Sequence, residues 1–86
     1  MPYIKKEARE QFEYLVGLMN STTIPTGGDL NYLITQLTHA FLNQRTKSYQ
    51  NFSDAGFALE GAAQELYRKY VAPYEDLKAE ENGDVP

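Results

Sequence analysis

The chain has 86 residues, no cysteine and a formal net charge of −4 at pH 7. This length predicts one helical domain over residues 1–86, with a small core that self-association would supplement. The acidic balance argues against direct nucleic-acid binding. The sequence has no apolar run typical of a signal peptide or of a membrane span, so we expect no membrane contact. It also has no cysteine for a disulfide framework, so we expect a cytoplasmic protein.

The first predicted element is a helix from about residue 6 to residue 20. Its apolar residues recur at the spacing that places them on one face, and they are Ala8, Phe12, Leu15, Val16 and Met19. Residues 20–28 combine hydroxyl side chains, a proline and two glycines, so we expect a loop. Gly27-Gly28 could cradle an anion, but Asp29 would repel phosphate, and a flexible turn is the favoured interpretation.

Two further helices are predicted from their start signals. Asp29 suits the first turn of a helix that continues to about Gln44, because a carboxylate there can accept backbone N–H bonds. Asn51 and Asp54 have the spacing of a capping box, so the next helix is expected over about residues 52–71. Its interior glycines cost helix stability, which favours compensation by a close helix or subunit contact.

The last fourteen residues hold the whole negative excess of the chain. Residues 1–72 carry seven positive and seven negative side chains, whereas residues 73–86 set five carboxylates against Lys78. Proline suits the first turn of a helix, so we expect the chain to kink or restart at Pro73 and to form a short acidic helix closed by Asn82-Gly83. The predicted fold is all-α, a small bundle of three main helices plus this short C-terminal helix.

Five strings carry a resemblance that spans nearly the whole chain. They are MPYIKK at 1–6, GDLNY at 28–32, SYQN at 48–51, APYED at 72–76 and ENGDV at 81–85. With these strings the sequence resembles a family of small uncharacterised proteins of bacteria and their phages. The resemblance implies family membership and carries no activity.

A candidate ligand site combines tyrosines with arginines. Tyrosine joins apolar area to a polar tip and can stack on a base, and arginine binds phosphate. The candidates are Tyr3, Arg9, Asn31, Tyr32, His39, Tyr67 and Arg68. Two structural alternatives remain. Tyr67, Tyr70 and Tyr74 could belong to an ordinary core, and His39 could be a half-buried surface histidine, which is the favoured interpretation of that residue.

A candidate partner site lies in the acidic C-terminal segment. Its residues are Tyr74, Glu75, Asp76, Glu80 and Glu81. They could engage a basic partner or the chain's own basic side chains, although exposed pairs contribute only about 0 to 1 kcal/mol each. No catalytic residue, metal site or cofactor is predicted, because one histidine with scattered carboxylates lacks the ligand pairing of helical metal sites.

These patterns together favour a non-enzymatic accessory binding protein of phage or bacterial origin with an anti-defence role. We expect a homo-oligomer that sequesters a nucleotide-like signalling molecule or inhibits a host protein. The alternative is an interaction module that docks a basic partner through its acidic C-terminal helix. A small enzyme would need His39 beside a carboxylate inside a cleft.

Overall fold

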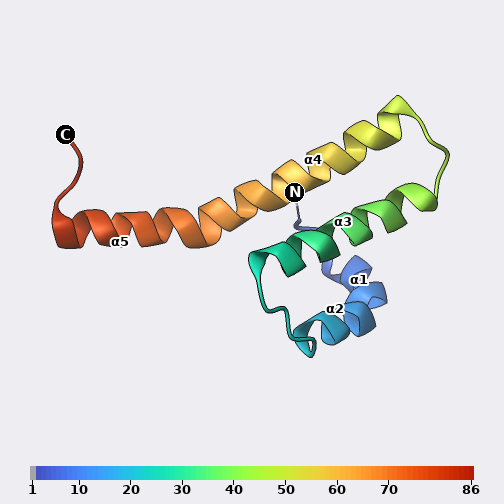
Figure 1. The fold of residues 1–86 in the computed structure, drawn as a ribbon, viewed down its shortest axis with the longest axis horizontal. Helices are drawn as coiled ribbons and strands as arrows, with labels where there is room; N and C mark the ends of the chain where they lie inside the picture. The colour runs from blue at the N-terminus through green and yellow to red at the C-terminus, as the bar shows by residue number, and fades with distance from the viewer. Residues whose placement is uncertain (1) are drawn as a thin grey trace. The chain divides into compact units, whose positions relative to one another are not determined.

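The computed structural model describes residues 2–86, and every regular element within them is helical. The all-α prediction is therefore confirmed. The chain divides into an N-terminal unit, residues 3–55, and a C-terminal unit, residues 56–86, to which Pro2 is also assigned. Figure 1 colours the elements of both units in chain order. Met1, which begins the MPYIKK string, lies outside the described residues.

The predicted first helix is divided into three consecutive pieces. They are α1, Lys6–Arg9, a 3₁₀ turn at Glu10–Phe12, and α2, Glu13–Asn20. The C-terminus of α2 is closed by hydroxyl groups, because Ser21 Oγ donates to the Gly17 carbonyl at 2.9 Å and Thr22 Oγ1 donates to the Leu18 carbonyl at 2.6 Å. These bonds satisfy carbonyls that the end of a helix leaves without a partner.

The second helix begins earlier than predicted. Helix α3 covers Gly27–Asn43, and Thr26 is its N-cap. Thr26 Oγ1 accepts the Asp29 backbone N–H at 3.1 Å and donates to Asp29 Oδ2 at 2.7 Å. The predicted place of Asp29 in the first turn of the helix is confirmed. The prediction of a flexible turn at Gly27-Gly28 is wrong, because both glycines belong to the first turn of α3.

The third helix also begins early, with Ser48 in the role that was predicted for Asn51. Helix α4 covers Tyr49–Leu66. Ser48 Oγ accepts the Asn51 backbone N–H at 3.1 Å, and the Ser48 carbonyl accepts the Phe52 N–H at 3.0 Å. The Asn51 side chain donates instead to the Thr46 carbonyl at 2.6 Å. The predicted N-cap is therefore wrong by three residues.

The C-terminal unit is one uninterrupted run of helix up to Asn82. Helix α4 passes into a π-helical turn at Tyr67–Val71 and then into α5, Ala72–Asn82 (Figure 1). The Ala72 N–H donates to the Tyr67 carbonyl, five residues earlier. The prediction of a break at Pro73 and of only a short helix after it is wrong, because α5 is 11 residues long and follows without interruption. The π turn accommodates Pro73, because the backbone directly before it already departs from the i→i−4 hydrogen-bond pattern that a proline would interrupt.

Helix α5 ends as predicted. Gly83 has φ +86° and ψ 139°, and it is the one residue with positive φ among those described. Glycine enters this region without the steric penalty that a Cβ would bring. The Asn82-Gly83 stop signal is thereby confirmed.

Candidate functional site

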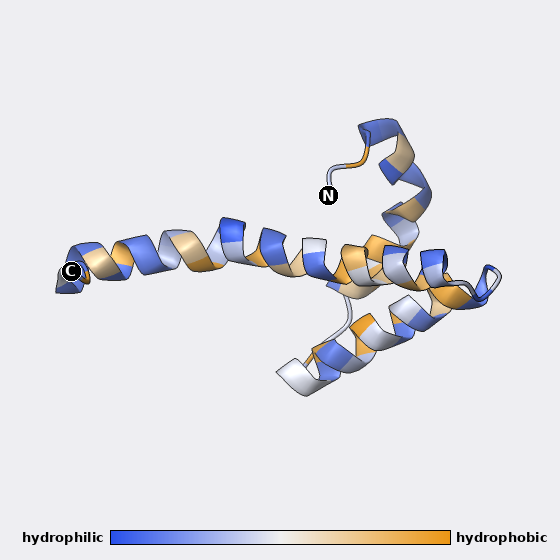
Figure 2. Ribbon diagram, turned by 90° about the horizontal axis from the view of Figure 1, so that it is seen from above, coloured by the Kyte–Doolittle hydropathy of each residue, from blue (hydrophilic) through white to orange (hydrophobic). Residues whose placement is uncertain are grey.

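The apolar faces predicted as core remain largely exposed in each unit. Among residues 2–86, Ala55 alone is buried, with 7% of its surface exposed. In the N-terminal unit, large apolar side chains of the 3₁₀ turn, α2 and α3 keep more than a third of their surface; they include Phe12, Leu15, Val16, Met19, Leu30, Leu33, Ile34 and Leu37. Figure 2 shows apolar and hydrophilic residues alternating along the helices. Surface of this extent is typical of proteins that bind other proteins.

The C-terminal unit carries an apolar stripe of its own. Leu66, Tyr70 and Tyr74 follow one another at steps of four and are 56%, 62% and 59% exposed, and Leu77 continues the series at 50%. A step of four exceeds one α-helical turn of 3.6 residues, so such a series drifts around a regular helix. The π turn at Tyr67–Val71 takes one additional residue and offsets that drift. We call Leu66, Tyr70, Tyr74 and Leu77 the tyrosine stripe.

The predicted ligand site is divided between the two units. Tyr3, Arg9, Asn31, Tyr32 and His39 belong to the N-terminal unit, whereas Tyr67 and Arg68 belong to the C-terminal unit. Their gathering into one site stays a prediction.

Within the N-terminal unit, the polar candidates serve local structure. Arg9 Nε donates to the Ile4 carbonyl at 2.9 Å and holds the segment that precedes α1. Asn31 Oδ1 accepts from Thr35 Oγ1 at 3.2 Å, one turn along α3. Tyr32 and His39 are exposed on the same helix, so the half-buried interpretation of His39 is wrong.

In the C-terminal unit, Arg68 is engaged with a carboxylate. Its Nη2 lies 2.7 Å from Glu65 Oε1, and its Nε donates to Glu65 Oε2 at 3.2 Å. This two-point contact matches the fork of a guanidinium to a carboxylate. A phosphate bound by Arg68 would have to compete with Glu65. Tyr67, beside it, is about half exposed.

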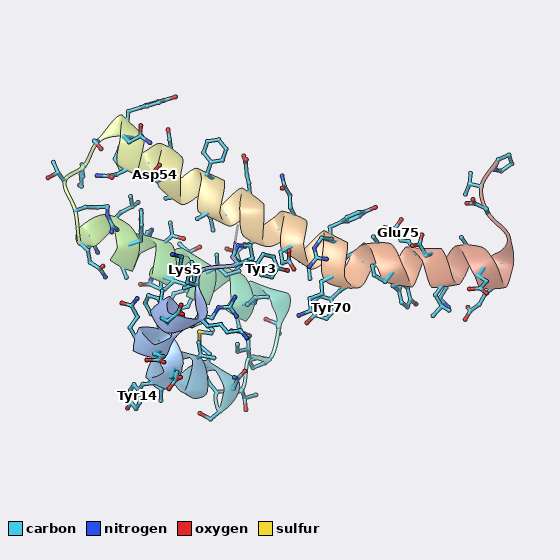
Figure 3. The ribbon with its side chains drawn as sticks, turned by 180° about the vertical axis from the view of Figure 1, so that it is seen from behind. Tyr3, Lys5, Tyr14, Asp54, Tyr70 and Glu75 are labelled. Carbon is cyan, nitrogen blue, oxygen red and sulfur yellow. The ribbon has the colours of Figure 1, made fainter. Side chains whose placement is uncertain are left out.

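The predicted partner residues all lie on α5 and all are exposed. Lys78 Nζ lies 3.2 Å from Glu81 Oε2 and 5.5 Å from the centroid of the Tyr74 ring. Glu75, Asp76 and Glu80 form no ion pair within residues 2–86. Figure 3 shows Tyr70, in the π turn, and Glu75, in α5, on different sides of the continuous helical run. Glu75, Asp76 and Glu80 therefore remain available to a cation.

Lys69 follows Arg68 and, like it, is a candidate contact for phosphate or for the carboxylates of the C-terminal segment, although it is not among the predicted site residues. It is exposed at the N-terminal end of the acidic region, and its Nζ lies 5.8 Å from the centroid of the Tyr70 ring. The spacing of 66, 70 and 74 was the available signal for a surface that includes this lysine. On a regular α-helix these positions already lie within about 80° of one another, so the apolar face was readable from the sequence, whereas its exposure was not.

A family model described as a domain of unknown function, DUF6899, matches residues 1–85. The chain belongs to this family. The DUF6899 match confirms the resemblance to a family of uncharacterised proteins, and it extends over both units. Comparisons of this DUF6899 chain with curated proteins and with solved structures gave no match. Across residues 2–86, none of the helices has the length and apolar character needed to cross a membrane, and no group of three potential metal ligands occurs.

Proposed function

We propose that this DUF6899 protein is a non-enzymatic binding protein that works as a homo-oligomer. The observation that supports this most directly is the exposure of the predicted core, since Ala55 alone is buried among the described residues. Fully burying one large apolar side chain contributes about 1.5 to 3 kcal/mol. A chain of 86 residues buries a smaller share of its surface than a larger domain does, and association would add further apolar contacts.

The captured partner in this proposal is a host protein. Exposed tyrosines in both units suit a protein interface, where aromatic side chains are enriched. A nucleotide-like molecule is the weaker candidate, because Arg9 and Arg68 already donate to the Ile4 carbonyl and to Glu65. The accessory, anti-defence role in a phage or bacterium is part of the proposal and rests on the resemblance of the sequence.

Native mass spectrometry of the full chain tests this proposal. We expect masses at multiples of the 9.8 kDa chain, with the monomer appearing on dilution. A bare monomer at every concentration would contradict the proposal. A retained mass of a few hundred daltons that denaturation releases would replace the host protein by a small ligand.

The acidic helix supports a second candidate function, docking to a basic partner. Glu75, Asp76 and Glu80 have no ion pair within residues 2–86, so their field is not locally neutralised. Such docking weakens as salt screens the charges. The test compares binding to a lysine-rich peptide by the triple variant E75Q/D76Q/E80Q and by a control with the same loss of charge, E7Q/E10Q/E13Q. Loss in the first variant alone is expected, and equal loss in both would refute docking through α5.

A further inference from the structure

We propose that the helix of residues 66–82 pairs with the same helix of a second copy, antiparallel, about a two-fold axis close to Tyr74 and Glu75. This rests on the proposed self-association and names the surface that carries it. The occupant of the tyrosine stripe is therefore another copy of the chain. A symmetric contact of this kind is the commonest way in which soluble proteins form dimers.

The stripe supplies enough surface for such a contact. Leu66, Tyr70, Tyr74 and Leu77 are each at least half exposed, and Tyr67 and Val71 border them at 53% and 37%. Covering the exposed parts of these side chains removes roughly 500 Å² per copy from water, or about 1,000 Å² for the pair. That area meets the minimum of about 1,000 Å² for a biological interface and lies in the range of weaker, transient contacts.

The distribution of charge selects the antiparallel orientation. In a parallel pair, the acidic ends of two α5 helices would lie side by side, with Glu75, Asp76 and Glu80 of each copy near their own counterparts. In the antiparallel pair centred on residues 74 and 75, Lys69 of one copy lies opposite Glu80 of the other. The contact occurs twice by symmetry. Like charges are thereby separated and unlike charges are brought together.

The groups involved are available for these contacts. Glu80 has no ion pair within residues 2–86, and Lys69 is exposed beside the Tyr70 ring. Arg68 keeps Glu65 as its partner and is not needed across the pair. Within one chain, eleven residues separate Lys69 from Glu80, which is about 16 Å along the helix and beyond direct contact. An effect that links these two residues must therefore come from the second copy.

Spin labels at two sites of the full chain test the orientation. The sequence has no cysteine, so Gln64→Cys and Asp76→Cys each give a single label site, and both positions are exposed. At a rise of 1.5 Å per residue, the two-fold axis offsets the labels along the helix by about 32 Å at position 64 and about 5 Å at position 76. A parallel pair offsets neither. We therefore expect a clearly longer same-site distance at position 64.

Equal distances at the two sites, or a longer one at position 76, would overturn the antiparallel pair. An oligomer in which neither label has a partner within range would overturn the pairing surface and leave the proposed self-association standing. A monomer in native mass spectrometry would overturn both. The two proposals thus fail in distinguishable ways.

Charge exchange gives an independent test. We expect K69E and E80K each to raise the dissociation constant roughly tenfold, because each places two like-charge pairs across the axis. The double variant K69E/E80K should return it close to the value of the unmodified chain. K47E, in the loop between α3 and α4, makes the same change of charge outside the stripe and serves as the control. A double variant weaker than both single variants would refute the pairing of these residues.

Discussion

Removal of the Thr26 hydroxyl tests the start of α3 most directly. In the variant T26V, the Asp29 N–H loses its acceptor at 3.1 Å, and the Asp29 carboxylate loses a donor at 2.7 Å. Loss of an N-cap side chain costs about 0.5 to 2 kcal/mol, typically about 1 kcal/mol. In a domain of this size, 1 kcal/mol lowers the melting temperature by roughly 4 to 8 °C. We expect a shift of that size for T26V.

Far-UV circular dichroism would measure the change in thermal unfolding and in urea unfolding. Both are followed at one protein concentration, because self-association contributes to stability. T26S keeps an oxygen at the same position and should retain most of the stability. T35V removes a hydroxyl from the middle of the same helix, where it donates only to the Asn31 side chain, and should cost less than T26V. If T26V unfolds at the same urea concentration as the unmodified chain, the cap does not stabilise α3 and the helix begins after a flexible turn.

Three further substitutions have expected outcomes. A55L adds volume at the one buried position among those described and should lower the free energy of unfolding by about 1 to 3 kcal/mol. A58L, at an exposed position of the same helix, should change it little, and equal urea midpoints for the two variants would contradict the burial of Ala55. G83A places a Cβ at φ +86° and ψ 139°, a conformation that glycine alone enters readily, at a local cost of about 1 to 3 kcal/mol. Amide hydrogen exchange should therefore quicken in the last turn of α5 but not in α3, and unchanged exchange in that turn would contradict the backbone conformation. Y70S should raise the dissociation constant of the oligomer, measured by sedimentation, at least tenfold, whereas Y14S, at an 80% exposed tyrosine of α2, should leave it unchanged. An equal effect of both variants would show that the tyrosine stripe is not part of the interface.

The sequence predicted those features of the fold that depend on neighbouring residues. The periodicity of the apolar positions indicated helices throughout, Asp29 marked a first turn, and Asn82-Gly83 marked a helix end. Ser48 was missed because serine and asparagine are both good N-caps, and nothing local decides between two candidates three residues apart. The π turn was missed because no residue type specifies it, and its position becomes apparent only from the hydrogen bond between Ala72 and Tyr67.

Less of the candidate site was predictable. Periodicity shows which face of a helix is apolar, but it does not show what covers that face, so the stripes predicted as core are exposed surfaces in the structure. Tyr67, Tyr70 and Tyr74 could equally have been buried on the sequence evidence. The roles of Arg9 and Arg68 depend on acceptors close along the chain, the Ile4 carbonyl and Glu65, and residue type alone does not reveal whether an arginine is already engaged.

The π turn also determines where this chain can tolerate a change in length. Removing one residue from a regular helix rotates everything beyond it by about 100°. Removing one residue between Tyr67 and Val71 instead returns the turn to α-helical geometry, and Tyr74 keeps its side of the helix. Within the family, insertions and deletions in the C-terminal helix are therefore expected to collect in this turn, where one residue can be gained or lost without reorienting the acidic end of the chain.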